Sequence, residues 1–488
     1  MEADGHHGGG LVSAPAVIDA DVGIVGAGPG GMAAALRLAD AGLAVVVLDE
    51  GMRPGGQIFR QLPAGFVSTA HPSEPPSHQQ GHELLRKLQR SKVRVEARAT
   101  VWDAAAPTGP GPVPHTGAAA QAGKLWFEQD GASRLLRCKA IVLAPGAYDR
   151  CVPFPGWTLP AVITLGAAQV MVRGFAIAPG TRAVVAGSGP LLLPTVTAML
   201  AAGVEVVAAL EAAPRLAVLA AIPGVLRSGA RLREAFWYAR QLLKAGVRLK
   251  FGHAVFAVEG NGRVERAVIG KVDAAGMPLR HTARTVEADV VCTGFGLVPS
   301  IEIGQKLGCA TVWNETSGGW CLEAGPFGQT SVQNVFAAGE IAGIGGSEVA
   351  IADGEAVAGL IVANLRGAPA PLPLSSRRQS ARSAAFAMLR AFHVRPGLFS
   401  LAQPDTIVCR CEDVTVQSAR AAALVHGSTL RGIKMGCRAG MGPCQGRLCT
   451  PNVQALASSV GAAKWDLPTV QVPLKPVATA TILDAPKG

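Results

Sequence analysis

Apolar and polar residues follow one another in blocks that predict a strand, a helix and a second strand near the start of the chain. Val22 to Val25 is a short apolar run, residues 28–41 are rich in Ala and Leu, and Val45 to Leu48 is a second apolar run. Short apolar runs are typical of buried parallel strands, and the longer segment between them has the length of a helix. The same order returns at residues 182–211. The pattern therefore predicts an α/β chain with two strand-helix-strand units.

Three glycines lie between the first strand and the helix, in the order Gly26-x-Gly28-x-x-Gly31. Gly26 permits a tight turn, Gly28 lets the backbone approach a pyrophosphate, and Gly31 lets the helix pack closely on the strand. The N-terminus of the helix offers free N–H groups to the phosphates. Asp49 or Glu50, at the end of the second strand, is placed to bind ribose hydroxyls. The segment predicts a dinucleotide bound by a doubly wound, Rossmann-like domain.

Two further turns are expected along the same cofactor. Gly55, Gly56 and Gln57 follow the second strand, and Gly146 ends the apolar run of residues 135–146. Small residues at the end of a strand let the backbone pass close to a ligand. Taken alone, Gly55 and Gly56 would indicate an ordinary Pro-Gly-Gly turn.

The second strand-helix-strand unit carries a weaker nucleotide motif. Gly187 and Gly189 are present, but Leu192 stands at the third glycine position, so the helix cannot approach the strand as closely. Glu211 stands at the ribose position, which favours NAD or another adenine nucleotide over NADP. The alternative is a βαβ scaffold that binds no nucleotide.

Half of the ten cysteines lie between residues 409 and 449. Cys409 and Cys411 form a C-x-C pair, and Cys444 and Cys449 form a C-x4-C pair. Four thiolates from two loops suit an iron-sulfur cluster or zinc. Zinc ribbons prefer C-x2-C spacing, so the one-residue spacing favours iron. Cys437 is a fifth cysteine that could replace one of the four ligands.

Composition excludes several classes of function. The net charge is +11, but Lys and Arg are scattered, which argues against nucleic acid and favours anionic cofactors, acidic substrates or an acidic redox partner. No apolar run reaches the length of a transmembrane span. No secretory signal is visible at the N-terminus, so we expect a cytoplasmic protein.

The blocks predict a domain order. Residues 213–247 are expected to be helical and Arg-rich, with packing in the core favoured over contact with another polypeptide. The predicted divisions are a flexible tail at 1–20, a first domain at 21–175, a second nucleotide-binding domain at 176–287, a return to the first domain at 288–368, a linker with a short helix at 369–404, a cysteine module at 405–455 and a tail at 456–488.

Two strings carry a family resemblance. Residues 143–169, LAPGAYDRCVPFPGWTLPAVITLGAAQ, and residues 440–449, GMGPCQGRLC, resemble segments of the alpha subunits of opine oxidases and D-hydroxyproline dehydrogenases, and of the corresponding subunit of hydrogen cyanide synthase. Sarcosine oxidase alpha subunits are a more distant match. All belong to the flavoproteins with two dinucleotide-binding domains, and the cysteine module resembles the mainly helical BFD-like 2Fe-2S domain. The resemblance covers roughly residues 20–455.

The resemblance implies a fold, cofactors and partners. It implies FAD in the first domain, with Gly339 and Glu340 at the last flavin-binding strand, where the superfamily has Gly-Asp. It also implies a 2Fe-2S cluster on Cys409, Cys411, Cys444 and Cys449.

The chain would then be the electron-transfer subunit of a heteromeric amine dehydrogenase that acts on an opine, D-hydroxyproline or a related amino acid. Its implied partners are a D-amino-acid-oxidase-like FAD subunit, joined in some relatives by a small 2Fe-2S ferredoxin-like chain. Electrons would pass to a quinone, cytochrome or dye, which allows a peripheral place at the inner membrane. No acid/base pair for amine oxidation is recognisable, so no catalytic residue is assigned.

Two alternative functions stay open from the sequence. An NAD(P)H-dependent ferredoxin or disulfide reductase would need a cysteine pair beside the flavin, but Gln57 is followed by IFRQ. A non-catalytic scaffold would bind zinc in the cysteine module, and metal analysis with an absorption spectrum separates it from the first two.

Overall fold

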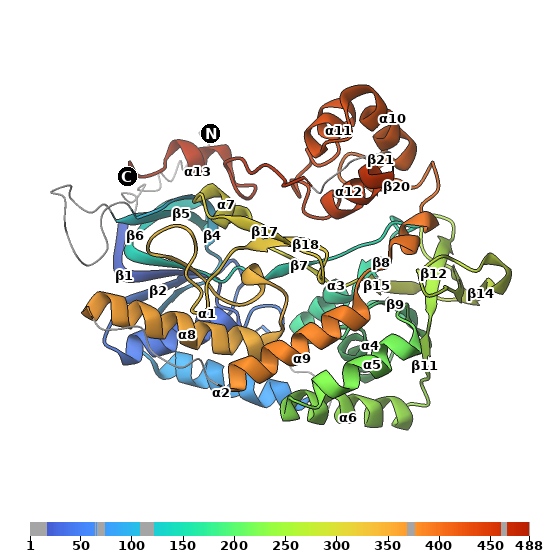
Figure 1. The fold of residues 1–488 in the computed structure, drawn as a ribbon, viewed down its shortest axis with the longest axis horizontal. Coiled ribbons are helices and arrows are strands. Elements are labelled where there is room, and N and C mark those ends of the chain that lie inside the picture. The colour runs from blue at the N-terminus through green and yellow to red at the C-terminus, as the bar shows by residue number, and fades with distance from the viewer. Residues whose placement is uncertain are drawn as a thin grey trace, which may run out of the picture.

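The computed structural model describes residues 17–63, 65, 74–107, 122–367, 376–459 and 466–487. Figure 1 shows two α/β units side by side, with a small helical module above them. The first unit contains the N-terminal strands and the long helix α8, and the second contains the strands and helices drawn in green. Two α/β units with a separate, mainly helical cysteine module are the architecture that the sequence predicts.

The first unit is built on a seven-stranded sheet. Its order is β3-β2-β1-β6-β5-β4, and β19 pairs with the end of β6. The strands are β1 (Val17–Val25), β2 (Val45–Leu48), β3 (Arg94–Glu96), β4 (Thr100–Ala105), β5 (Gly123–Gln129), β6 (Ala132–Leu143) and β19 (Val335–Ala337). β1, β2, β3, β19 and the end of β6 run parallel. Their carboxyl ends therefore meet at one edge of the sheet, which is where ligands bind in such sheets.

Helices α1 (Pro29–Asp40) and α8 (Ser347–Arg366) pack against each other over this sheet. A Cβ at Gly354 would lie 2.1 Å from the carbonyl oxygen of Gly30, so only glycine permits this close crossing. α2 (Pro76–Arg90) packs beside α1. The crossing brings the N-termini of α1 and α8 to the carboxyl edge of the sheet.

The second unit has a five-stranded parallel sheet of order β11-β10-β9-β15-β8. Its strands are β8 (Val162–Thr164), β9 (Arg182–Gly187), β10 (Glu205–Glu211), β11 (Leu249–Phe251) and β15 (Val290–Gly294), and its helices are α3 (Leu165–Gln169), η1 (Val170–Gly174), α4 (Leu192–Ala201), α5 (Arg215–Val225) and α6 (Gly229–Lys244). A three-stranded sheet of β12 (His253–Glu259), β13 (Arg266–Lys271) and β14 (Arg284–Glu287), with η2 (Arg280–Thr282), completes the unit.

Two predicted boundaries are wrong. The strand at 290–294 was expected in the first domain, but Val291 pairs with Val184 and Val162 of the second sheet. The second unit therefore begins before residue 176 and extends past 288. Both sheets contain short apolar strands that end in glycine, so the pattern along the chain cannot say which sheet a strand joins.

Two of the segments that cross between the units pair with each other. β7 (Ala147–Asp149) leads out of the first unit and β16 (Leu297–Pro299) leads back, and they form an antiparallel pair. The first unit then continues through α7 (Glu302–Lys306), β17 (Thr311–Asn314), β18 (Gly319–Leu322) and η3 (Gly339–Ala342).

The predicted linker is largely a helix packed on both units. α9 (Ser376–Phe392) has 17 residues and contacts α5 and α8. Arg378 is buried and donates to the Asp353 carboxylate of α8 at 2.7 Å. The expectation of a short helix in a linker is therefore wrong, because Ala381, Ala384 and Ala385 give the helix a buried face. η4 (Pro396–Leu401) follows.

The cysteine module contains β20 (Ile407–Cys409), β21 (Val414–Thr415), α10 (Val416–His426), α11 (Leu430–Cys437) and α12 (Thr450–Ser459). Residues 466–487, including α13 (Thr479–Leu483), leave the module and return along the first unit. Leu474 donates its backbone N–H to Trp102 O at 2.8 Å, and Trp126 donates to Pro486 O at 3.1 Å. The predicted boundary at 455 is therefore too early, and residues 466–487 are not a free tail.

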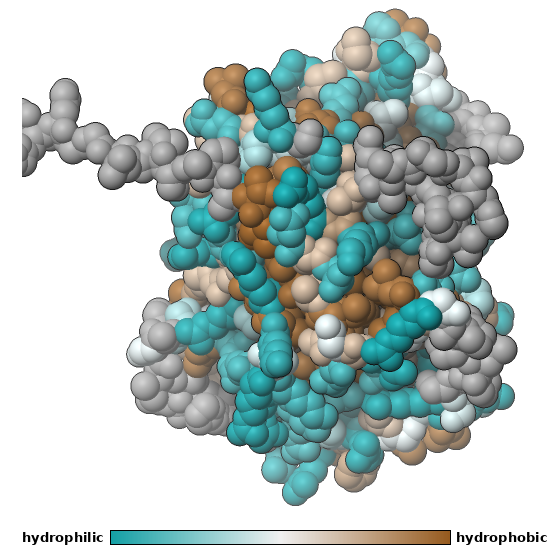
Figure 2. Space-filling model, turned by 90° about the vertical axis from the view of Figure 1, so that its left-hand side faces the viewer, coloured by the Kyte–Doolittle hydropathy of each residue, from teal (hydrophilic) through white to brown (hydrophobic). Residues whose placement is uncertain are grey.

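The helices of the described residues give no sign of a membrane span, since none is both long enough and apolar enough to cross a bilayer. Figure 2 views the end of the molecule formed by the first unit, where hydrophobic residues are interrupted by hydrophilic ones.

Candidate cofactor sites

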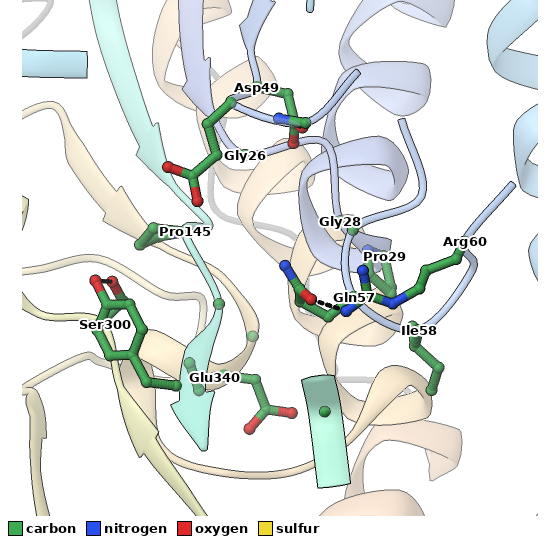
Figure 3. Close-up of a pocket in the computed structure, with 18 of the residues that line it drawn as sticks. Gly26, Gly28, Pro29, Asp49, Gln57, Ile58, Arg60, Pro145, Ser300 and Glu340 are labelled. Carbon is green, nitrogen blue, oxygen red and sulfur yellow. Dashed lines mark hydrogen bonds between the residues drawn. The ribbon is translucent and has the colours of Figure 1, made fainter. Parts of the chain in front are cut away.

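A cavity of about 970 Å³ lies at the carboxyl edge of the first sheet. Figure 3 shows Gly28, Gln57 and Arg60 on one side of it and Pro145 and Ser300 on the other. The predicted residues that line it are Gly26, Gly28, Asp49, Glu50, Gly56, Gln57, Gly146, Gly339 and Glu340. Segments far apart in the sequence thus meet along one elongated space, as a dinucleotide needs.

The glycines of the first turn divide into two roles. Gly28 has φ −73°, and a Cβ there would meet only the Gly56 Cα at 4.0 Å. At Gly31, in contrast, a Cβ would lie 1.9 Å from Gly26 O, and at Gly55 it would lie 2.2 Å from Phe59 O. Gly31 and Gly55 do not line the cavity and serve the packing of the turns, whereas Gly28 leaves space for a ligand at the N-terminus of α1.

The two candidate ribose acids are separated by their hydrogen bonds. Asp49 accepts from the backbone N–H groups of Ala27 and Gly51, and burial raises its pKa. Glu50 is exposed at the cavity and pairs with Lys475 from the returning C-terminal segment. Asp49 therefore holds the glycine turn, and a bond from Glu50 to a ribose stays a prediction.

Glu340 is held by the turn in front of α8. Its carboxylate accepts from Gly345 N at 3.0 Å and Gly346 N at 2.7 Å, and burial raises its pKa. The extra methylene, compared with Asp, lets the side chain reach this turn. The carboxylate therefore shapes the N-terminus of α8 at the cavity, and the bond to a flavin ribityl hydroxyl stays a prediction.

The far end of the cavity carries polar side chains that the sequence analysis missed. Ser77 donates to Glu234 at 2.7 Å, and Tyr238 of α6 lines the same end. His78 is half-buried beside Arg173, and its desolvation lowers the pKa of His78 to about 4. These residues come from α2, η1 and α6, so no local pattern groups them. Among the described residues that line the cavity there is no cysteine, as the sequence indicated for this region.

The second nucleotide motif is covered by other parts of the chain. Both oxygens of Glu211 are taken, by Gly189 N at 3.1 Å and Ala213 N at 2.8 Å, and burial raises its pKa to about 7. Ser188 donates to Phe392 O at 3.1 Å, so the end of α9 lies on the glycine turn. Glu211 is 2% exposed, and neither Gly187 nor Gly189 lines the cavity. The chain itself covers the predicted ribose position.

The four predicted cluster ligands come together in the module. The sulfur of Cys449 interacts with the sulfurs of Cys409 and Cys444, which lowers the pKa of both, and Cys411 interacts with Cys444. Backbone N–H groups of Gly440, Gly446 and Leu448 donate to these sulfurs. Thiolates with N–H donors around them are the donor set of a 2Fe-2S cluster.

Two further observations bear on this set. Cys437 is directed elsewhere, since its thiol donates to Ile433 O at 3.1 Å. Within the described residues, no three His, Cys, Asp or Glu side chains form a group that could hold a metal ion. The sulfur contacts run from Cys409 through Cys449 and Cys444 to Cys411, so these four cysteines are the residues that would hold a 2Fe-2S cluster.

The module is docked on the cavity through Arg447, which lies between Cys444 and Cys449. Arg447 donates to Tyr148 OH at 2.8 Å and pairs with Glu302 at 3.0 Å. Its side chain is only 10% exposed, and it lines the cavity together with Leu448. On the other side of the module, Trp157 donates to Ile407 O at 2.6 Å. The module therefore lies against the wall of the cavity in the first unit.

Comparison with known proteins agrees with this architecture. Residues 20–356 match the family described as pyridine nucleotide-disulphide oxidoreductase, and residues 407–459 match the BFD-like [2Fe-2S] binding domain. The chain is 31% identical to the A-subunit of opine oxidase from Rhizobium meliloti, over 96% of this chain and 88% of that protein. It is 32% identical to the HcnB subunit of hydrogen cyanide synthase from Pseudomonas aeruginosa, over 87% and 90%.

A solved structure, L-proline dehydrogenase from P. horikoshii, shares the fold. It superposes with a TM-score of 0.65 at 18% identity and covers 98% of this chain and 82% of that one.

Proposed function

Since the chain belongs to the pyridine nucleotide-disulphide oxidoreductase family and to that of the opine oxidase A-subunit, we propose that it is the electron-transfer subunit of a heteromeric amine dehydrogenase. It is an FAD-dependent oxidoreductase with a BFD-like [2Fe-2S] domain. FAD accepts an electron pair, and a 2Fe-2S cluster carries single electrons to the next carrier.

The observation that carries this proposal is the position of the C-x4-C loop. Arg447, between two of the cluster cysteines, reaches the wall of the FAD cavity and bonds to Tyr148 and Glu302. The chain's own residues therefore fix the cluster loop against the flavin domain. A fixed short separation between two cofactors is what an electron relay requires.

The site residues have distinct proposed roles. Gly28 and the N-terminus of α1 bind the pyrophosphate, Glu50 binds the ribose of the adenosine, and Gly56, Gly146 and Gly339 let the backbone approach the cofactor. Cys409, Cys411, Cys444 and Cys449 hold the cluster, and N–H groups of Gly440 and Gly446 tune it.

The amine is oxidised on a companion, a D-amino-acid-oxidase-like FAD subunit. The support is that the similar proteins, from opine oxidase and from hydrogen cyanide synthase, are subunits by name. The substrate is an opine, D-hydroxyproline or a related amino acid, and electrons leave to a quinone, cytochrome or dye instead of oxygen. A small ferredoxin-like chain can join the complex, which resides in the cytoplasm or at the inner membrane surface.

The test is reconstitution of amine oxidation. The isolated chain, loaded with FAD and iron, is expected to give no amine-dependent reduction of a dye, whereas the intact complex oxidises one amine of the proposed class. The measurement is a screen of amines with an artificial dye acceptor, together with iron and zinc analysis. Steady turnover by the isolated chain, or zinc in place of iron, would contradict the proposal.

A reductase driven by NADH is the competing function, and the covered second motif argues against it. We expect NADH and NAD to show no binding by calorimetry and NADH to leave the flavin oxidised under anaerobic conditions, because Phe392 and Glu211 close the site. Dithionite is the control that shows the flavin to be reducible. Reduction by NADH at a rate that saturates with its concentration would show that the second motif opens to admit it.

A further inference from the structure

Helices α5 and α6 carry a row of large apolar side chains that no described part of the chain covers. We call this surface the α5–α6 face and define it by Leu216, Leu219, Leu226, Leu232, Phe236 and Leu243. Leu216, Phe236 and Leu243 are 79%, 73% and 82% exposed. On α6, positions 232, 236 and 243 recur at helical spacing, so they form one stripe. The prediction that residues 213–247 pack in the core is wrong for this side of the pair.

The opposite side of α5 packs closely on the rest of the protein, so the exposed leucines do not result from a loosely packed helix. Ala221 and Gly224 are buried there, and α9 packs on this side. A Cβ at Gly224 would lie 2.3 Å from the Cβ of Ala387. The helix therefore turns its small residues inward and its leucines outward. Folded proteins that work alone rarely expose this many large apolar side chains on two neighbouring helices, so this face is suited to another molecule.

The charges around the face have one sign. Arg215, Arg227, Arg233, Arg240 and Lys244 are exposed. The only acid between residues 215 and 244 is Glu234, which turns to Ser77 at the cavity. A second copy of this chain, docked face to face, would oppose cation to cation. The partner that fits presents an apolar surface with an acidic rim.

We propose that the α5–α6 face binds the companion amine-oxidising subunit, an inference that rests on the proposed function. The inner side of α6 supplies Glu234 and Tyr238 to the far end of the FAD cavity. A protein seated on the outer side is therefore separated from the cavity by one helix, which is about 10 Å thick. The face thus places the companion next to the end of the cavity at Glu234 and Tyr238. This end lies opposite Glu50, the residue proposed to bind the adenosine.

An anionic membrane surface is the other chemistry that basic and apolar helices can bind. The proposed function requires a companion subunit, so we propose a protein and not a membrane at this face. The test below distinguishes the two.

The experiment uses the full-length, cofactor-loaded chain and the companion purified with it. The co-purified chain is accepted as the companion only if, after separation, it contains flavin that an amine reduces. Its affinity is then measured by calorimetry for the wild type and for the double variant Phe236→Glu, Leu243→Glu. The matched control is Leu483→Glu on α13, which is 79% exposed at the other end of the molecule.

We expect the double variant to bind the companion about 100-fold more weakly, with flavin and iron contents unchanged, and Leu483→Glu to bind like the wild type. Hydrogen exchange should show protection of residues 215–244 on binding. Companion affinity within about threefold of the wild type would overturn the docking site.

Three further results are informative. Loss of binding to phosphatidylglycerol vesicles, with companion affinity unchanged, would assign the face to a membrane and overturn the proposal. Dimerisation of the wild-type chain that the double variant abolishes would also overturn it. Amine oxidation by the wild-type chain without any companion would instead refute the proposed function and, with it, this inference.

Discussion

Replacing Gly28 by valine is expected to abolish flavin binding while the protein without cofactor stays folded. Position 28 has φ −73°, which valine adopts without strain, and the nearest atom to an added Cβ is 4.0 Å away. The branched side chain would project into the space that a pyrophosphate needs at the N-terminus of α1. We expect FAD affinity to fall by more than about 100-fold, with the unfolding temperature of the apo protein unchanged.

The measurement is the flavin absorbance of the purified protein, together with thermal unfolding of both apo forms. Gly31→Ala is the matched comparison, because its Cβ would lie 1.9 Å from Gly26 O. That variant should lose both flavin and stability, since it forces α1 away from β1. A Gly28→Val protein that retains full flavin would show that the pyrophosphate is bound elsewhere.

Replacing Cys444 by serine is expected to remove the iron cluster and leave flavin content intact. The Cys444 sulfur contacts both Cys411 and Cys449, so it is central to the group of four. A serine hydroxyl is a harder and less acidic ligand than a thiol and suits an iron-sulfur site poorly. In the assembled complex we expect flavin reduction by the amine to change little. Electron transfer to the external acceptor should slow by about 100-fold or more.

Iron content, flavin content and the two half-reactions measured by rapid mixing check this expectation. Cys437→Ser is the control in the same module, because the Cys437 thiol donates to Ile433 O and lies outside the sulfur group. It should retain iron. Equal slowing of both half-reactions by Cys444→Ser would contradict the electron-relay role.

The local part of this architecture could be predicted because short spacings decide it. The turn at Gly26 and the pairs at Cys409 and Cys444 are set by neighbouring residues, and the structure gathers them as expected. The choice between Asp49 and Glu50 could not be made, because it depends on which carboxylate the backbone of the turn captures.

Other features depend on pairing between distant segments. Val290–Gly294 has the same pattern as a strand of either sheet, and only its partners show that it belongs to the second. The periodicity of α6 is that of a helix packed in the core. It identifies the apolar side of the helix but does not say what packs against that side. The second glycine turn at Ser188 is covered by the backbone of Phe392, which lies far along the chain, and no motif describes this contact.

The return of residues 466–487 along the first unit sets a timing for biosynthesis. Leu474 and Lys475 form part of the cavity wall, and Lys475 pairs with Glu50, yet Glu50 is made more than four hundred residues earlier. A nascent chain that has released its first sheet still has an open cavity at the adenosine end. That opening can close only after the cysteine module and residues 466–487 have been synthesised. Flavin can therefore enter between the synthesis of α8, which completes the first unit's wall of the cavity, and that of residues 474 and 475, which narrow its adenosine end.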